Sequence, residues 1–370
     1  MAHALALVVL AALLGGCGGG GDRAGYLAKS RELLPQTLKS DDSSVRGFGL
    51  EVYRDLHLAA PKEALAALVH DSEVPVRFNA LVLLAAQAKT AEEKEAARRA
   101  FEKVLAEDAD RNVRLAAAYG LATLGDTSQV GLLAEALADQ ENVAGRRNAA
   151  MLLGLLGNGS AATMLKEHLK DPDTMVRINV GEALVRLGVQ AGLTPLRQVA
   201  RDSSSPAQVS AILALGRVGF PPEDIQNLRE VQGRHPSVGA LLATFGARAM
   251  LGDYTQIIFL TEVASGAEKN APLTDQDQAF ALQLLARAAY GPAWAEVGKC
   301  LGDRNLAVAY SAAWAELAFD TPRGQRLKTT IRDAEKSQML TQEEVLRRSA
   351  PAKTPTGTRS QTPGYVPVGR

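Results

Sequence analysis

The stretch "DPDTMVRINVGEALVRLG" at residues 171–188 decides the fold, because it recurs along the chain. Close copies are "DADRNVRLAAAYGLATLG" at 108–125 and "DSEVPVRFNALVLLAAQA" at 71–88, and "DSSSPAQVSAILALGRVG" at 202–219 is a more distant one. "NVAGRRNAAMLLGLLG" at 142–157 keeps the second half of the pattern. Such self-similarity is typical of a protein that is built from stacked repeats.

One position, usually an arginine, marks the register of the copies. It is occupied by Arg46, Arg77, Arg114, Arg146, Arg177 and then Gln208, at intervals of 31 to 37 residues. A longer helical segment at 91–108 accounts for the 37-residue interval. A period in this range indicates one supersecondary unit per copy, each in contact with its neighbours.

Within a copy the apolar residues have helical spacing, as Val176, Val180 and Leu184 show. A second helical segment precedes this one, such as "SAATMLKEHLK" at 160–170. Each unit is therefore predicted to be a helical hairpin, and the hairpins must stack because one alone cannot bury its apolar stripe. Four glycines follow the last apolar position, where a left-handed residue commonly ends a helix: Gly125, Gly157, Gly188 and Gly219.

The repeated Asp, the Val-Arg pair, the small residues after it and the Leu-Gly end resemble HEAT repeats of the short type called PBS-lyase HEAT-like repeats. The resemblance implies an all-α fold, an alpha-alpha superhelix of about nine helical hairpins over residues 26–319, with the second helices on its concave side. It also implies a scaffold for protein partners. Leu241 and Ala309 occupy the arginine place in the last units, so the register after residue 220 stays open.

The N-terminus indicates export and lipidation. The apolar run at 4–14 is too short to cross a bilayer, which takes about 20 residues as a helix, and it fits a signal peptide. "LLGGC" at 13–17 resembles the bacterial lipobox, which implies a signal peptide at 1–16 and a lipid on Cys17. Gly18 favours, by the same resemblance, the outer membrane facing the periplasm. A simple secretory signal with an incidental cysteine is the alternative.

The segments outside the repeats have their own composition. A Gly-rich tether is predicted at 17–25, possible capping helices at 320–349, and a disordered tail rich in Pro, Thr and Gly at 350–370. The tail is basic and could therefore contact an anionic polymer of the envelope. The alternative is a solvated chain end without a partner. The whole chain has 41 basic and 41 acidic residues. Nucleic-acid binding needs a basic surplus, so no nucleic-acid partner is expected.

Aspartate and arginine recur six positions apart in three of the repeats. The pairs are Asp71 and Arg77, Asp108 and Arg114, and Asp171 and Arg177, and Arg146 belongs to the same series. This spacing places the guanidinium in the first turn of the second helix, where a cation opposes the helix dipole. A bond to an aspartate of the same or the next unit would offset that cost. The pattern therefore predicts a structural ladder, and the alternative is a polar line that reads an extended peptide.

The sequence lacks the spacings of catalytic and metal sites. The five histidines form no HExxH pattern and the two cysteines form no CxxC, so we expect no metal and no cofactor. Cys300 lies in an apolar helix and is predicted to be a small buried residue. We expect a protein that is not an enzyme. The competing hypothesis, a lyase-like enzyme or enzyme accessory subunit, predicts His and acidic side chains gathered on the concave face.

The second helices are apolar on more than one side. Positions one, five and eight after the arginine point away from the core stripe and hold mostly apolar residues. On a concave surface they would form an apolar groove, and exposed apolar patches mark partner surfaces. The candidate partner-binding residues are Phe78, Leu115, Tyr119, Met151 and Ile178. The alternative is that they pack between neighbouring second helices. The function predicted from the sequence is a lipid-anchored, non-catalytic scaffold for protein-protein interaction in the bacterial cell envelope.

Overall fold

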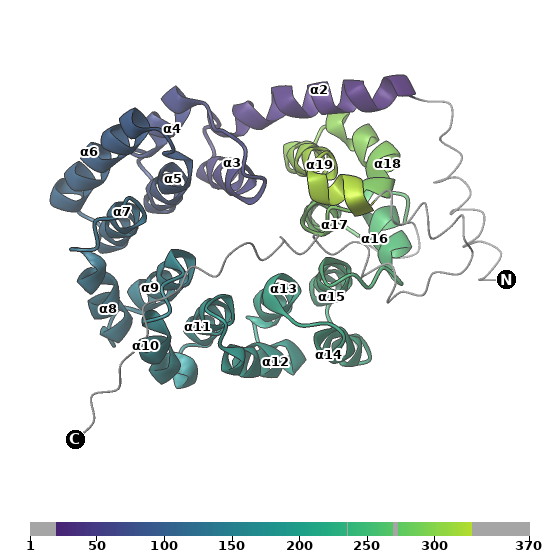
Figure 1. The fold of residues 1–370 in the computed structure, drawn as a ribbon. Helices are drawn as coiled ribbons and strands as arrows, with labels where there is room; N and C mark the ends of the chain where they lie inside the picture. The colour runs from purple at the N-terminus through teal and green to yellow at the C-terminus, as the bar shows by residue number, and fades with distance from the viewer. Residues whose placement is uncertain (1–19, 235, 269–272, 328–370) are drawn as a thin grey trace, which may run out of the picture.

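The computed structural model of this chain describes residues 20–234, 236–268 and 273–327, and every regular element in these ranges is a helix. The helices pair into hairpins that are stacked one after another (Figure 1). The predicted all-α class and the alpha-alpha superhelix are therefore confirmed. The predicted signal peptide at 1–16, Cys17 and the predicted tail at 350–370 lie outside the described residues.

The described helices form nine hairpins, each with a first and a second helix. The first helices are α2 Gly20–Thr37, α4 Lys62–Leu68, α6 Ala91–Glu107, α8 Val130–Ala138, α10 Ala161–Glu167, α12 Leu193–Arg201, α14 Glu223–Gln232, α16 Ile257–Ala264 and α18 Trp294–Lys299. The second helices are α3 Ser43–Asp55, α5 Val74–Gln87, α7 Arg111–Thr123, α9 Val143–Leu156, α11 Thr174–Arg186, α13 Gln208–Val218, α15 Val238–Met250, α17 Asp275–Ala288 and α19 Leu306–Phe319. Short 3-10 helices, η1 His168–Lys170, η2 Gln190–Gly192, η3 Gly291–Ala293 and η4 Cys300–Gly302, adjoin some of them.

Polar residues in the turns determine where several second helices begin. Asp42, Asp110, Asn142 and Asp173 each precede such a helix and accept hydrogen bonds from its first backbone amides. These amides have no partner inside the helix, and a capping side chain of this kind stabilises a helix by about 1 kcal/mol.

Glycines end several of the second helices. Gly125, Gly157 and Gly188 have positive φ angles of 96°, 69° and 82°, as the sequence predicts. Gly219 differs, with φ −68° and ψ 166°. Its amide donates to the Leu215 carbonyl oxygen at 2.7 Å, and a Cβ at Gly219 would lie 2.4 Å from that oxygen. Glycine is needed there because the backbone approaches closely, so the predicted left-handed end is wrong at this position.

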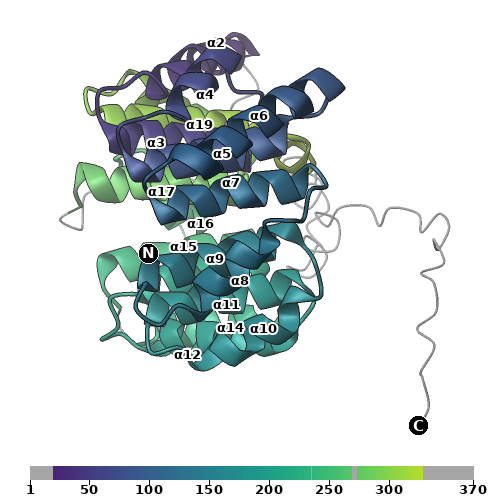
Figure 2. The ribbon, with the colours of Figure 1, turned by 90° about the vertical axis from the view of Figure 1, so that its left-hand side faces the viewer.

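The core lies between the hairpins. Val176, Val180 and Leu184 of the predicted stripe are fully buried, and α11 packs against α9 on one side and α13 on the other. Seen from the side, the hairpins follow one another as a stack (Figure 2). Each apolar stripe is therefore covered by its neighbours, as stacked repeats require.

The stack closes on itself into a ring. The second helices form its inner wall, and α2 at the beginning of the chain lies against α19 and α18 at the end (Figure 1). One contiguous cluster of buried apolar residues includes members from 33 to 184 and from 242 to 327. The two ends of the repeat array thus share a core, and the open curved surface expected from the sequence is instead the inside of a ring.

Aromatic and charged side chains make the seam between the two ends. The rings of Tyr26 in α2 and Trp294 in α18 lie 6.1 Å apart. Arg31 of α2 donates to Asp320 at 3.3 Å, and Arg23 donates to the Phe319 carbonyl oxygen at 3.4 Å. The seam therefore joins residues almost 300 positions apart in sequence.

Two predicted boundaries change in the structure. Helix α2 begins at Gly20, so residues 20–25 of the predicted tether at 17–25 are helical. In the predicted capping segment at 320–349, residues 320–321 form a turn and residues 322–327 are helical. Residues 328–349 lie outside the described residues. No helix in the described ranges is long and apolar enough to span a bilayer.

Gly298 of α18 provides a test of ring closure. A Cβ at Gly298 would lie 2.0 Å from Cδ2 of Tyr26, whereas a Cβ at Gly302 would meet nothing within 4 Å. Gly298→Ala should therefore weaken the docking of α2 by about 1–3 kcal/mol, the usual cost of overpacking. Hydrogen exchange in α2 measures this effect. Gly302→Ala is the matched control and should leave α2 protected; equal protection in both variants would contradict the closed seam.

Candidate functional site

Arginines at the start of the second helices bind aspartates of the next unit. Arg46 donates through Nε to Asp71 Oδ2 at 2.7 Å and through Nη2 to Oδ1 at 2.8 Å. Arg77 binds Asp108 in the same way at 2.8 and 3.1 Å. Both contacts use two parallel N–H···O bonds, which is the strongest arginine–carboxylate geometry. Of the two partners that the sequence allowed, an aspartate of the same unit or one of the next unit, these arginines bind the aspartate of the next unit.

The third nitrogen of each arginine binds its own turn. Nη1 of Arg46 donates to the carbonyl oxygens of Ser40 and Asp41 at 2.8 and 2.9 Å, and Arg77 and Arg177 repeat this contact. These carbonyl contacts, together with the aspartate, offset the unfavourable position of a cation at a helix N-terminus. Each complete rung therefore ties two successive turns together.

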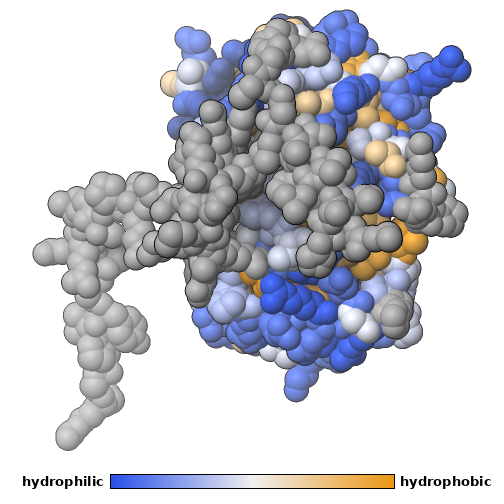
Figure 3. All heavy atoms as spheres, turned by 90° about the vertical axis from the view of Figure 1, so that its right-hand side faces the viewer, coloured by the Kyte–Doolittle hydropathy of each residue, from blue (hydrophilic) through white to orange (hydrophobic). Residues whose placement is uncertain are grey.

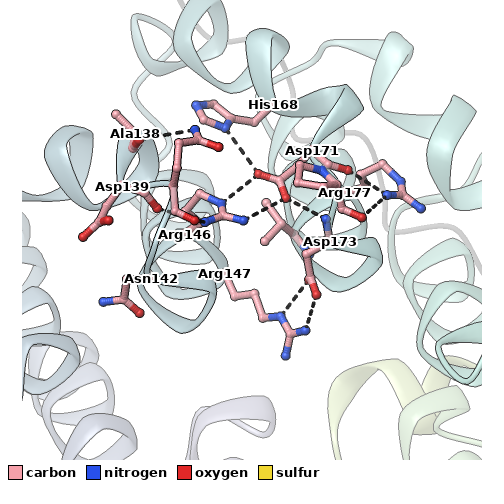
Figure 4. A network of polar contacts seen from close by, with 12 residues as sticks. Ala138, Asp139, Asn142, Arg146, Arg147, His168, Asp171, Asp173 and Arg177 are labelled. Atoms are coloured by element: carbon pink, nitrogen blue, oxygen red, sulfur yellow. Dashed lines mark hydrogen bonds and ion pairs between the residues drawn. The ribbon is translucent and has the colours of Figure 1, made fainter.

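The rung between α9 and α11 is the most deeply buried (Figure 4). Arg146 binds Asp171 at 2.8 and 3.2 Å, with only 2% and 1% of the two side chains exposed. Burial raises the pKa of Asp171, but the hydrogen bonds from Arg146 and from the Asp173 amide outweigh it and hold that pKa below its usual range. The neighbouring Arg147 points to Asp173, which it binds at 2.7 and 2.9 Å.

Two predicted rungs differ from this pattern. Arg114 binds the carbonyl oxygens of its own turn, and Arg177 binds those of its own turn and the hydroxyl of Thr174. Within the described part of the chain, neither arginine forms a hydrogen bond or an ion pair with a carboxylate. The aspartate in the corresponding turn of the next unit is Asp139, and it binds Arg111 at 3.1 Å instead. The ladder is therefore interrupted, and the expectation that Arg177 is paired with an aspartate is wrong.

The inner wall of the ring carries a set of charged residues, which we call the interior cluster. It consists of Glu51, Arg54 and Asp55 of α3, Glu182 and Arg186 of α11, Arg217 of α13 and Arg287 of α17. Arg217 and Arg186 each bind Glu182 at 2.7 Å. Arg287 binds Glu51 at 2.7 Å and lies over the ring of Trp314 at 4.7 Å from its centroid.

These charges compensate one another across the ring. Burial raises the pKa of Glu182, yet the bonds and charges of Arg217 and Arg186 outweigh burial and lower it to about 2. Burial lowers the pKa of Arg217 on α13, but its hydrogen bond to Glu182 and the charges of Glu182, Asp55 and Glu51 outweigh burial and raise that pKa. Helices from opposite parts of the chain therefore influence each other electrostatically across the interior, so the inner surface is polar rather than an uninterrupted apolar groove.

The candidate partner-binding residues lie mostly in the core. Phe78, Leu115, Tyr119 and Ile178 are between 2% and 7% exposed, and Met151 is half-buried against the same core. Their side chains pack between hairpins, which is the alternative that the sequence left open. The expectation of an exposed apolar groove is therefore wrong, while contact with a partner through these residues stays an untested prediction.

The sequence contains a signal for the interior cluster. Asp55, Arg186, Arg217 and Arg287 each stand nine positions after the residue that begins the repeat register, which is Arg46, Arg177, Gln208 and Gln278. Charged residues at one fixed position of otherwise apolar helices indicate a shared polar environment. Glu51 and Glu182 stand five positions, and Arg54 eight positions, after the same register residue, among residues that are otherwise mostly apolar.

A hollow of about 520 Å³ lies where the helices α15, α17 and α19 begin. Its lining residues are Gly239, Asp275, Gln276, Asp277, Ala279, Phe280, Gln283, Asn305 and Ala307. Leu241, Gln278 and Ala309 occupy the arginine place in these three helices, so the ladder has stopped there. Val238 and Leu306 beside the hollow are 46% and 59% exposed.

The remaining chemistry of the described residues is modest. No group of three or more His, Cys, Asp or Glu side chains in these ranges could hold a metal ion. Cys300 is buried, and burial raises the pKa of its thiol to about 11, so the thiol stays protonated at neutral pH and is a poor nucleophile. On the face shown in Figure 3, the surface that grey atoms do not cover is largely hydrophilic above and below, with smaller apolar areas between these parts.

The ladder predicts a difference between two arginines that share the carbonyl contacts. Arg146→Ala removes a buried pair and leaves Asp171 uncompensated, so the free energy of unfolding should fall by about 3–5 kcal/mol. Arg177→Ala is the matched control, because it loses hydrogen bonds but no carboxylate partner, and should cost about 1–2 kcal/mol. Urea unfolding of both variants measures the difference. Equal losses would show that the Arg146–Asp171 pair adds nothing to the stack.

Comparison with protein families identifies this architecture. A model of HEAT repeats matches three overlapping stretches, 98–178, 131–216 and 163–239. These stretches begin in α6 and end in α15, and they include the Arg146–Asp171 rung. A search of curated proteins finds no match to the sequence. The chain contains HEAT repeats.

Proposed function

We propose that this protein is a non-catalytic scaffold for protein-protein interaction, held at a membrane of the cell envelope by a lipid on Cys17. The observation that carries the proposal is the HEAT-repeat stack, because repeats of this kind generally form protein-interaction modules. Its interior charges are neutralised by one another, which is typical of a structural role. The outer membrane facing the periplasm is the location that the sequence after Cys17 favours.

The position of Cys17 suits an anchor. It precedes the first residue of α2, Gly20, by three positions, so a lipid there is joined to the ring through a very short connection. Because α2 is the helix that closes the ring, the seam is the part of the ring nearest to the anchor. We infer that the membrane side of the protein is the side that carries the start of α2.

Lipidation is tested by one substitution. Cys17→Ala should abolish labelling with a fatty-acid analogue and release the protein from membranes, because it removes the sulfur that carries the lipid. Cys300→Ala is the control, since that thiol is buried in the ring, and it should keep both properties. Equal labelling of the Cys17→Ala variant and the unchanged protein would refute the anchor.

The rim around the hollow is the surface that we propose for partners. The inner surface is charged and paired, and four of the five candidate residues are buried. The rim, in contrast, combines exposed apolar side chains, Val238 and Leu306, with polar groups such as Asn305 and Gln276. An apolar centre with polar surroundings is the usual anatomy of a protein-protein interface.

Crosslinking in native envelopes, followed by mass spectrometry, tests this surface. Leu306→Glu should reduce the yield of crosslinked partner about 5- to 150-fold, which corresponds to the loss of about 1–3 kcal/mol at an interface. Phe220→Glu is the matched control, because Phe220 is similarly exposed, at 45%, but lies outside the residues that line the hollow. It should leave the yield unchanged.

The same measurement distinguishes the inner residues from the rim. If Tyr119→Ala keeps its melting temperature but loses the partner while Leu306→Glu retains it, the partner binds through the inner wall and the rim proposal is wrong. If Tyr119→Ala lowers the melting temperature and still captures the partner when folded, the packing role of Tyr119 is supported.

A further inference from the structure

The seam of the ring buries a carboxyl group that has no partner. Glu316 lies in α19, the helix against which α2 docks. Its exposed fraction is 0%, and neither of its carboxyl oxygens has a hydrogen-bond partner. Buried polar groups are almost always hydrogen-bonded, and a buried ionised carboxylate without a partner is especially costly. Glu316 therefore differs from the carboxylates of the interior cluster, Glu51, Asp55 and Glu182, which are paired with arginines.

The charged groups around Glu316 do not neutralise it. From α2 the guanidinium of Arg23 acts on it, but this group donates to the Phe319 carbonyl oxygen and lies 4.0 Å from Asp320. Asp320, directly after α19, acts in the opposite sense because like charges repel. Arg31 of α2 is bound to Asp320. Arg23 and Arg31 therefore bind groups at the end of α19 and leave the carboxyl of Glu316 unpaired.

The other elements that pack against α19 offer no closer partner. On α17, Arg287 is bound to Glu51 and Asp55, and Asp275 and Asp277 lie in its first turn. On α18 and η4, the titratable groups are Glu296, Lys299 and Cys300.

The helical segment after α19 contributes two arginines. Arg323 donates to the Met250 carbonyl oxygen, and Arg326 follows it in the same segment. Neither forms a hydrogen bond with Glu316, whose two oxygens have no partner. A neutral, protonated carboxyl is the form that suits this environment, because it carries no charge that needs compensation.

We propose that Glu316 makes closure of the ring proton-dependent: the seam between α2 and α19 closes when Glu316 holds a proton and loosens when the carboxyl ionises. Opening separates α2 from α19 and gives the carboxylate access to water. The proton leaves to solvent in that step, so opening and deprotonation are coupled. The proposal concerns the seam and does not depend on lipidation or on the identity of a partner.

The direction of the pH dependence follows from linkage. Burial raises the pKa of Glu316 from its ordinary value of 4.5 to about 8 in the closed ring. The closed state thus binds more protons than the open state at any pH between these values, and closure weakens as the pH rises through this window. Between about pH 6 and pH 8 the closing equilibrium constant should fall about 50-fold.

The two tryptophans of the chain report on the seam. Trp294 packs against Tyr26 of α2, and Trp314 packs edge-on against Phe48 of α3 at 5.6 Å. Tryptophan emission of the full-length protein, followed during urea titration, therefore measures opening of the seam. For the unchanged protein, the urea concentration at which the emission changes should be lower at about pH 8 than at about pH 6, as the weaker closure requires.

Substitutions at Glu316 test the cause. Glu316→Gln keeps the shape but cannot ionise, so the shift between the two pH values should disappear. Glu316→Leu is a second variant, which should also remove the shift. Glu296→Gln is the matched control, since Glu296 has a buried oxygen without a partner on the neighbouring α18, and it should keep the shift of the unchanged protein.

The outcomes separate clearly. A shift that is present in the unchanged protein and in Glu296→Gln, and absent in both Glu316 variants, establishes the proposal. A shift of the same size in a folded Glu316 variant, or no shift in the unchanged protein, overturns it. Loss of the shift in Glu296→Gln would assign the proton-dependent step to α18 and would overturn the role of Glu316 as well.

Discussion

A helical hairpin with apolar residues on both sides must be covered by a neighbour on each side, and this constraint governs the whole structure. In a linear stack the first and last units lack one neighbour, so they need polar outer faces or caps. Here the two ends cover each other, since α2 docks on α19 and the buried cluster continues across the seam. Ring closure thus replaces the caps that a linear array needs, and it also leaves an inner wall that is no longer an open surface.

The repeats, and the fold class with them, could be predicted from the sequence because the information is local. Arg177 and the stripe of Val176, Val180 and Leu184 repeat within neighbouring units, and a helix depends on neighbours in sequence. Closure could not be predicted in this way. It depends on small rotations between units, added over nine hairpins, and on contacts such as the one between Arg31 and Asp320. No local pattern specifies such a contact.

The candidate site shows the same division. The pairing of Arg77 with Asp108 follows from the recurrence of both residues. At Arg177 the aspartate of the next turn, Asp202, instead accepts hydrogen bonds from Ser204, and the recurrence alone does not reveal this. Tyr119 and Ile178 are apolar or aromatic residues on a helix face, and a sequence cannot tell whether that face meets water or another helix. The electrostatic influence of Glu51 and Asp55 on Arg217 could not be predicted either. To predict it, one would have to know that α13 and α3 line the same interior.

Closure also has a consequence for the order in which the chain matures. The contact between Arg23 and Phe319 spans 296 positions, so α2, the helix that begins the ring, finds its docking surface on α19 only after nearly the whole ring is made. Until then α2 is covered by α3 alone, and the growing stack exposes an apolar end. Contacts between distant parts of a chain form slowly and leave intermediates prone to association. The newborn chain therefore passes through an open, end-exposed stage whose natural hazard is the exchange of α2 between two molecules.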